Sequence, residues 1–137
     1  MRTTVLFSAL LLLVAGTNYS CKQATASAQG NIVKNISIAL GKGDAEGVAN
    51  YFPNSVGISV LQKAPVYYSK QQGKQVLSDF FKKHPPHRFD KAHAGGKNSA
   101  QFTMGDLSTS SGVFRVTFFL KNVGGKPFIQ NLIIDKK

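Results

Sequence analysis

Apolar residues recur at a helical spacing in the stretch that follows residue 30. They are Ile32, Val33, Ile36, Ala39 and Leu40, and residues three and four apart lie on one face of a helix. Gly41 follows in the position at which glycine commonly ends a helix. Asp44 then offers a side chain that can cap a second, shorter helix, which Pro53 ends. The pattern therefore predicts two successive helices.

A third helix has the clearest start and end signals in the chain. Ser69 and Gln72 have the spacing of a capping box, in which each side chain satisfies a free backbone N–H at the helix start. The apolar stripe of this helix comprises Val76, Leu77, Phe80 and Phe81. Lys83 and His84 suit the negative end of the helix dipole, and the prolines at 85–86 stop the helix.

From residue 88 onward the apolar period changes to the two-residue alternation that is typical of strands. Together with two shorter segments upstream, the pattern predicts strands at residues 56–61, 66–68, 88–94, 99–107, 113–123 and 127–134. The last strand alternates Phe128, Leu132 and Ile134 with Ile129 and Ile133. Because both of its faces are apolar, we expect it to be covered on both sides.

The predicted order is helix, helix, strand, strand, helix and then four strands, which is typical of an α+β protein with helices packed on an antiparallel sheet. The chain has 137 residues, enough for one small domain. We expect the sheet to curl as a cone around the third helix. Such a cone leaves an apolar mouth at one end, and mouths of this kind are common ligand sites.

The beginning of the chain has the pattern of an export signal. Arg2 precedes an apolar run at residues 5–15. At about 1.5 Å per residue this run is too short to cross a bilayer as a helix, and it is typical of a signal peptide. We therefore predict a signal peptide at residues 1–20.

Two interpretations of the residues after this signal remain open. Cys21 follows small Ser20 a few residues beyond the apolar run, where bacterial lipoproteins are cut and lipidated. Alternatively, an ordinary signal is cut at the small residues around Ala28, and Cys21 is removed or idle. Either way we expect an exported protein, periplasmic or anchored by lipidated Cys21, with a flexible tether at 21–30 and one domain at 31–137.

The charge balance is strongly basic. Lys and Arg number 17 against 6 Asp and Glu, a formal net charge of +11. Nucleic acid is not an expected partner, because the protein is exported and its lysines are scattered without interleaved aromatic residues. The charge predicts either a solvated basic surface or a weak association with an anionic membrane surface. A single cysteine excludes an internal disulfide.

Four blocks of sequence carry a resemblance to a known family: GDAEGVANYFPNSVGISV, YSKQQGKQVLSDFFKKHPP, GDLSTSSGVFRVTFFLK and IQNLII. Over roughly residues 30–135 the chain resembles domain-of-unknown-function family 4783, whose fold is the nuclear-transport-factor-2-like, cystatin-like α+β cone. The resemblance implies that fold and a short exported protein of Gram-negative bacteria. It implies no reaction, because the fold hosts isomerases, dehydratases, hydrolases, binding modules and dimerisation modules.

Three histidines and a carboxylate lie close together in the sequence: His84, His87, His93 and Asp90. On one strand, His87 and His93 would lie about 20 Å apart, too far to share a metal ion. Three nearby glycines (Gly41, Gly43 and Gly47) follow a helix instead of a strand, so they do not match a phosphate-binding loop. We therefore predict no metal and no cofactor.

The aromatic residues offer a candidate ligand pocket. The candidates are Tyr51, Phe52, Tyr67, Tyr68, Phe80 and Phe81. Their rings could line an apolar cavity with phenolic hydroxyls for orientation, or they could simply pack in the core. Asp44, Asp79 and Asp106 are the carboxylates near predicted apolar faces, and each has an ordinary structural explanation, so we assign no catalytic residue.

Two further interactions are predicted from the long strands. Arg115 lies in mid-strand opposite the apolar face, where its charge needs water or a partner, and Asp106 on a neighbouring strand can pair with it. The second face of the strands carries Val113, Phe119, Ile129 and Ile133. An apolar patch of this kind predicts a homodimer through the sheet.

These observations favour a non-catalytic, exported binding or interaction module that holds a small apolar or amphiphilic ligand. The alternatives are a small-molecule enzyme of the isomerase or hydrolase type on the same fold, and a protein that binds anionic surfaces. An enzyme needs a carboxylate or histidine inside the cavity within hydrogen-bond reach of a second polar group.

Overall fold

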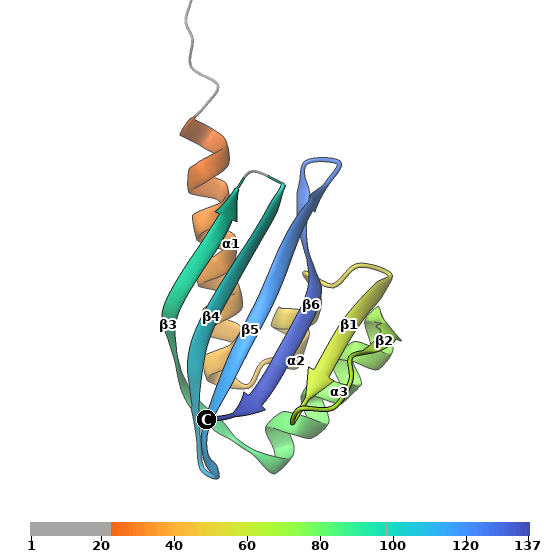
Figure 1. Cartoon of the computed structure of the whole chain (residues 1–137), viewed down its shortest axis with the longest axis vertical. Helices are drawn as coiled ribbons and strands as arrows, with labels where there is room; N and C mark the ends of the chain where they lie inside the picture. Colours follow the sequence, from red (N-terminus) through yellow and green to blue (C-terminus); the bar gives the residue numbers. More distant parts are fainter. Residues whose placement is uncertain (1–22, 98) are drawn as a thin grey trace, which may run out of the picture.

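Three helices cover one face of a six-stranded sheet in residues 23–97 and 99–137, which the computed structural model describes (Figure 1). The helices are α1 (Gln23–Lys42), α2 (Ala45–Ala49) and α3 (Lys70–Lys83). The strands are β1 (Ser55–Val60), β2 (Val66–Ser69), β3 (Pro86–Lys97), β4 (Ala100–Thr109), β5 (Gly112–Val123) and β6 (Lys126–Lys136). The order of elements and their layering confirm the predicted α+β class.

The strands lie in the order β2-β1-β6-β5-β4-β3. Neighbouring strands are antiparallel, except that β1 and β6 are parallel. The helices cover what we call the inner face of the sheet, and Figure 1 is viewed from the opposite, outer face. The short strand β2 and the long strand β3 form the two edges, so the β3 edge is the longer one.

The core lies between the inner face and the helices. Its strand residues include Val56, Ile58, Leu107, Phe114, Val116, Phe118, Leu120, Ile129, Leu132 and Ile134, and its helix residues include Ile36, Leu40, Val48, Leu77, Phe80 and Phe81. Helix α1 packs against β3 and β4, and α3 packs against β1 and β2. The ring of Phe80 lies 5.1 Å from that of Phe114 on β5. The third helix therefore places its aromatic stripe on the sheet, as the sequence predicts.

The predicted helix caps are present. The side chain of Asp44 accepts a hydrogen bond from the backbone N–H of Gly47 at the start of α2. At the start of α3, the Ser69 hydroxyl accepts from the N–H of Gln72, and the Gln72 side chain accepts from the N–H of Ser69. These bonds satisfy backbone donors that a helix leaves free at its first turn.

Helix α1 is longer than its apolar pattern predicts. It begins at Gln23, so residues 23–30 are helical where the sequence predicts a flexible tether. This segment has no large apolar residue, but alanine and glutamine favour a helix without one. The helix ends at Lys42, and the glycine in left-handed conformation after it is Gly43 (φ +69°), which corrects the predicted end at Gly41. The predicted signal peptide and Cys21 lie outside the described residues.

A bulge in β6 changes which residues face the core. Phe119 pairs with Asn131 and Leu120 pairs with Ile129, so that Gln130 is an extra residue on β6. The bulge places Ile129 on the inner face with Leu132, and Ile129 has 0% of its surface exposed. The prediction that Ile129 belongs to an outer dimer face is therefore wrong, because it extended a strict two-residue period through an interrupted strand.

Candidate functional site

A cleft opens between the middle of α1 and the adjoining parts of β3 and β4. Its volume is about 680 Å³. We call it the α1–β3 cleft, and its lining includes Val33, Lys34, Lys91, Ala94, Gln101 and Thr103. Apolar and polar side chains therefore share its walls, which suits an amphiphilic occupant.

A bulge in β3 shapes one wall of the α1–β3 cleft. Lys91 pairs with Gly105 and His93 pairs with Met104, so Ala92 is the extra residue. After the bulge, Ala94 pairs with Thr103 and faces the cleft as Lys91 does. A regular strand would instead place residues 91 and 93 on the same face. The bulge thus turns His93 away from this wall.

The opposite wall of the cleft is fixed by hydrogen bonds of α1. The Ser37 hydroxyl donates to the backbone carbonyl of Val33 at 2.7 Å. Gln101 Nε2 donates to Gln29 Oε1 at 3.0 Å, a bond that joins β4 to α1 at the border of the cleft. The distance between the two walls is therefore held by a direct contact as well as by core packing.

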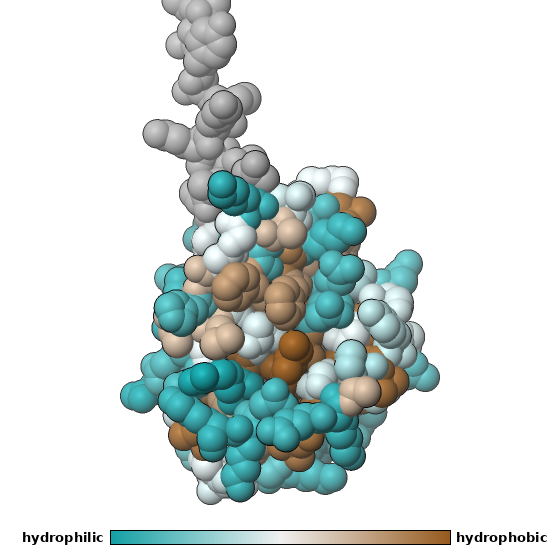
Figure 2. All heavy atoms as spheres, in the orientation of Figure 1, coloured by the Kyte–Doolittle hydropathy of each residue, from teal (hydrophilic) through white to brown (hydrophobic). Residues whose placement is uncertain are grey.

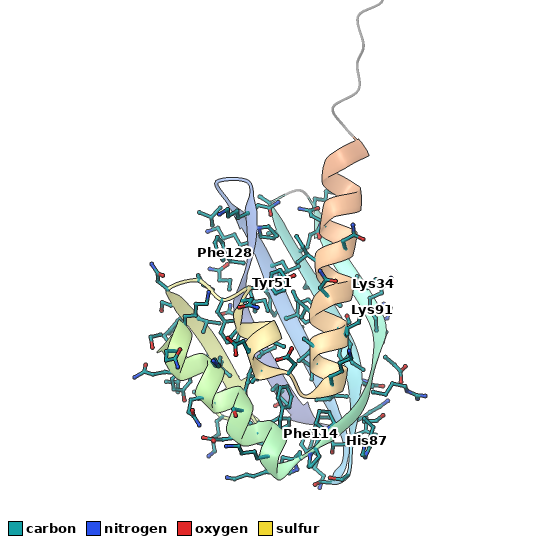
Figure 3. All side chains as sticks on the ribbon, turned by 180° about the vertical axis from the view of Figure 1, so that it is seen from behind. Lys34, Tyr51, His87, Lys91, Phe114 and Phe128 are labelled. Carbon is teal, nitrogen blue, oxygen red and sulfur yellow. The ribbon has the colours of Figure 1, made fainter. Side chains whose placement is uncertain are left out.

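The charge of the cleft is positive. Lys34 reaches it from α1 and Lys91 from β3, and Figure 3 shows the two side chains on these neighbouring elements. No Asp or Glu is among the described residues that line the cleft, and neither lysine forms an ion pair with a described residue. Two lysines without a carboxylate leave a local positive potential that favours an anion.

A second groove lies between β1, β2 and α3, and we call it the α3 groove. Its volume is about 320 Å³, and its walls are mainly apolar, with Ile58, Val60, Val66, Tyr68, Val76 and Phe80 among them. Asp79, Lys83 and His84 add charged or polar groups on the α3 side. This groove therefore contains the carboxylate and the imidazole that an acid–base mechanism requires.

The polar groups of the α3 groove are not joined to one another. Asp79 Oδ1 accepts a hydrogen bond from Gln75 Nε2 at 3.0 Å. His84 packs its ring against Phe80 and Phe114, at centroid distances of 5.0 and 4.8 Å. Among the described residues, its buried Nδ1 has no hydrogen-bond partner. Because the contact of Asp79 is with Gln75 and that of His84 is with two phenylalanine rings, the two groups do not form a catalytic pair in this conformation.

The six aromatic residues proposed as a pocket are dispersed. Only Tyr68 and Phe80 line the same groove. Phe52 and Phe81 are buried in the core, and Tyr67 lies on the outer face with 69% of its surface exposed. Tyr51 is half-buried beside α1, and its hydroxyl lies 3.4 Å from the Asn35 amide nitrogen that donates to it.

The sequence does not predict the α1–β3 cleft. Lys34 and Lys91 lie far apart in the chain and have no motif around them. They face one cleft because α1 crosses β3 and because the Ala92 bulge reverses the alternation of β3. The period-two pattern contains no signal for this bulge, and no other local pattern in the chain marks it.

The histidines do not gather. His87 is exposed at an irregularity at the start of β3, His93 is exposed in mid-β3, and His84 ends α3. Asp90 instead pairs with Arg88, whose Nε lies 2.7 Å from Asp90 Oδ2. Among the described residues, no group of three His, Cys, Asp or Glu side chains is placed to hold a metal ion.

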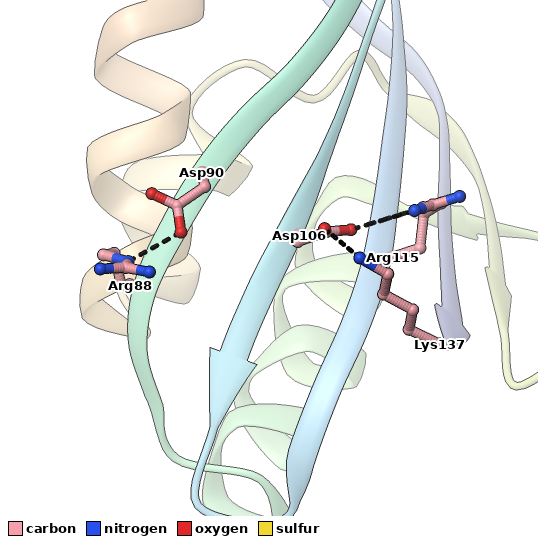
Figure 4. Close-up of polar contacts among 5 residues, drawn as sticks. All are labelled: Arg88, Asp90, Asp106, Arg115 and Lys137. Atoms are coloured by element: carbon pink, nitrogen blue, oxygen red, sulfur yellow. Dashed lines mark hydrogen bonds and ion pairs between the residues drawn. The ribbon is translucent and has the colours of Figure 1, made fainter.

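A carboxylate on the outer face is held by two cations (Figure 4). Asp106 and Arg115 are cross-strand partners, and Arg115 Nε lies 3.4 Å from Asp106 Oδ1. Lys137 Nζ lies 2.7 Å from Asp106 Oδ2. The hydrogen bond from Lys137 and the positive charges of Lys137 and Arg115 lower the pKa of Asp106, although partial burial opposes them. The cluster lies on the outer face, and none of its three residues lines either cleft.

The outer face also carries an apolar patch, which we call the outer patch. It consists of Phe102, Met104, Val113, Phe119 and Ile133. Figure 2 shows hydrophobic residues gathered over the middle of this face. The rings of Phe102 and Phe119 lie 6.2 Å apart, and Phe119 is 38% exposed. The prediction that β6 is covered on both sides therefore holds for its inner face, where the helices lie, whereas no element of residues 23–97 or 99–137 covers its outer face.

The family model "Domain of unknown function (DUF4783)" matches residues 33–135. The chain belongs to this family. A DUF4783 protein from Bacteroides ovatus has a crystal structure with 27% sequence identity and a TM-score of 0.72, and the match covers 75% of this chain and 93% of that one. For a DUF4783 protein from Bacteroides uniformis the identity is 26% and the TM-score 0.72, with coverages of 76% and 95%.

More distant structures define the fold of this DUF4783 domain. An NTF2-like protein of unknown function from Shewanella baltica is 18% identical, with a TM-score of 0.63 and coverages of 84% of this chain and 95% of that one. At this identity the likeness concerns the fold alone, and it confirms the predicted NTF2-like cone. A comparison with curated proteins found no match. No helix within residues 23–97 or 99–137 combines the length and the hydropathy that crossing a membrane requires.

Proposed function

We propose that this DUF4783 protein is an exported, non-catalytic binding module whose α1–β3 cleft holds a small amphiphilic anion. The observation that carries the proposal is the pairing of Lys34 and Lys91 across a cleft whose described lining has no carboxylate. A carboxylate or phosphate head group would lie between the two ammonium groups. Its apolar part would lie against Val33 and Ala94.

The dimensions of the cleft support this assignment. Small-molecule sites commonly have volumes of roughly 300–1,000 Å³, and the α1–β3 cleft has about 680 Å³. Amide and hydroxyl groups at Gln101 and Thr103 add hydrogen-bonding capacity beside the apolar wall. A head group of one negative charge therefore finds both a counter-charge and polar neighbours.

The chemistry of the cleft favours binding over turnover. Its described lining offers ammonium, amide and hydroxyl groups, whereas acid–base catalysis most often uses an imidazole or a carboxylate with a partner.

The α3 groove supports the second candidate function, a small-molecule enzyme of the isomerase or hydrolase type. Tyr68, Asp79 and His84 line that one groove, and a substrate-induced contact between Asp79 and His84 would be required.

A titration with laurate, a twelve-carbon carboxylate, tests the proposed function. We expect saturable binding to the native chain, followed by intrinsic tyrosine fluorescence or calorimetry. The double variant Lys34→Gln, Lys91→Gln should weaken binding about tenfold, because two partly exposed charge-assisted contacts are lost. The control variant Lys42→Gln, Lys136→Gln removes the same charge away from the cleft and should bind as the native chain does.

The outcomes of this titration separate the candidates. Equal weakening by the two double variants means that only the overall charge matters, which contradicts a site in the cleft. If His84→Gln weakens laurate binding and the loss of Lys34 and Lys91 does not, the ligand lies in the α3 groove. Turnover of a substrate that is abolished by His84→Gln or Asp79→Asn establishes the enzyme.

A further inference from the structure

One end of the molecule is built from three segments that are distant in the sequence. The connection between β3 and β4, the hairpin turn between β5 and β6, and the first turns of α1 all lie at this end (Figure 1). We call it the hairpin end. The β4–β5 turn, the end of α3 and the C-terminus lie at the opposite end. Because α1 begins at the hairpin end, residues 1–22 join the domain there.

The hairpin end carries positive charge without negative charge. Lys97 is the last residue of β3, and Lys121 and Lys126 flank the β5–β6 turn, all three of them exposed. No Asp or Glu occurs in residues 23–43, 94–103 or 118–129, from which this end is made. The three lysines therefore have no acidic neighbour in their own segments.

The carboxylates lie in other parts of the structure. Asp90, Asp106 and Asp135 are in one row across the sheet, together with Arg115. From Asp135 to Lys126 the strand runs nine residues, which is about 30 Å at 3.3 Å per residue. The separation exceeds the Debye length of about 8 Å at physiological salt. The acidic row therefore does not neutralise the hairpin end.

An apolar residue lies at the tip of this cationic end. Val123 precedes the turn at Gly124 and Gly125 and has 56% of its surface exposed. Both glycines have positive φ values, +58° and +79°, which favour glycine and keep the turn narrow. A narrow tip with one exposed apolar side chain between two lysines can enter the head-group region of a bilayer.

We propose that the hairpin end is a docking surface for an anionic lipid bilayer. Lys97, Lys121 and Lys126 pair with lipid phosphates, and Val123 enters the interface. The attachment of residues 1–22 at the same end favours a bilayer over other polyanions, because an apolar leader or a lipid on Cys21 would hold this end toward the membrane. The proposal does not depend on the ligand of the α1–β3 cleft.

Vesicle binding tests the docking surface. The full chain carrying Cys21→Ser, which bears no attached lipid, is sedimented with vesicles of equal parts phosphatidylglycerol and phosphatidylcholine, and with pure phosphatidylcholine. We expect stronger binding to the anionic vesicles. Each lysine at a charged membrane contributes about fivefold to affinity. The affinity for anionic vesicles should therefore fall about a hundredfold in the triple variant Lys97→Gln, Lys121→Gln, Lys126→Gln. About 0.5 M salt should abolish the difference between vesicles.

A matched variant removes three charges from the opposite end: Lys82→Gln, Lys83→Gln, Lys136→Gln. It should keep most of the anionic preference. Equal losses in the two triple variants, or no loss in either, overturn the proposal. The orientation is read from an environment-sensitive dye on Val123→Cys or, as the control, on Ser110→Cys in the β4–β5 turn. A blue shift on anionic vesicles at position 123 alone supports the proposal, and a shift at position 110 alone or at both positions contradicts it.

Discussion

Lys137 Nζ lies 2.7 Å from Asp106 Oδ2, so the last residue of the chain is tied to β4. This hydrogen bond, with the charges of Lys137 and Arg115, lowers the pKa of Asp106 below its ordinary value of 3.8. A carboxyl group with a lowered pKa stabilises the folded state above the unfolded-state pKa, and this contribution is lost as the pH falls through the folded-state value.

We therefore expect Asp106→Asn to lower the free energy of unfolding at pH 7 by about 0.5–1 kcal/mol, a small effect because the pairs are partly exposed. The difference between the variant and the native chain should shrink below about pH 4 and vanish in more acidic solution. Urea denaturation at a series of pH values measures it. A difference that stays constant down to pH 2 would mean that charge pairing is not its cause.

Gly73 is the residue that lets α3 approach β1. A Cβ at this position would lie 2.9 Å from Cγ1 of Val56 and 3.1 Å from the Phe52 ring. Overpacking costs about 1–3 kcal/mol, whereas alanine gains about 1 kcal/mol of helix propensity over glycine. We expect Gly73→Ala to destabilise the protein by up to about 2 kcal/mol.

Gly30 provides the control for this substitution. It lies in α1, and a Cβ there would meet no atom within 4 Å. Gly30→Ala should therefore stabilise the protein by up to about 1 kcal/mol. Thermal denaturation of the two variants compares them directly. Equal shifts of the melting temperature would contradict the close packing of α3 on β1.

The bulge at Gln130 makes opposite predictions for two isoleucines. Ile129 is buried in the core, whereas Ile133 lies half-buried on the outer face. Ile129→Ala should cost about 3 kcal/mol, as large-to-small changes in a core do, and Ile133→Ala about 1 kcal/mol. Denaturant unfolding of both variants gives the comparison. Similar losses, or a larger loss at Ile133, would mean that β6 has no bulge.

The outer patch remains the predicted surface for a homodimer. With Ile129 removed from the prediction, Phe119 is its most exposed aromatic residue. We expect the native chain to sediment as a dimer at micromolar concentration and Phe119→Glu to sediment as a monomer, because a charge in a two-fold interface faces its own copy. Val66→Glu, on the exposed edge strand β2, is the control. A native chain that is monomeric at these concentrations would refute the dimer.

The sequence predicted the features that depend on local patterns. The capping box at Ser69, the apolar stripe of α3 and the succession of helices and strands along the chain follow from propensity and periodicity. It did not predict the two positions at which β3 and β6 depart from the two-residue alternation of side chains. After the extra residues Ala92 and Gln130, the side chains of β3 and β6 point to the opposite faces from those that a strict two-residue alternation predicts. Neither position has a residue type that indicates a bulge.

The candidate site was less accessible to sequence analysis than the fold. The aromatic residues that the sequence suggests as a pocket are large, and most large apolar residues of a small domain are needed in its core. Phe52 and Phe81 are examples. The cleft instead depends on two lysines whose proximity arises from the crossing of α1 over β3. Tertiary contacts of this kind leave no local signal in one sequence.

Native mass spectrometry of the protein recovered from its producing cells tests whether Lys34 and Lys91 hold an amphiphilic anion in the α1–β3 cleft. We predict one bound anionic amphiphile per chain, which is lost in Lys34→Gln, Lys91→Gln and kept in Lys42→Gln, Lys136→Gln. An empty native chain, or a bound mass that survives the loss of both cleft lysines, would contradict the claim.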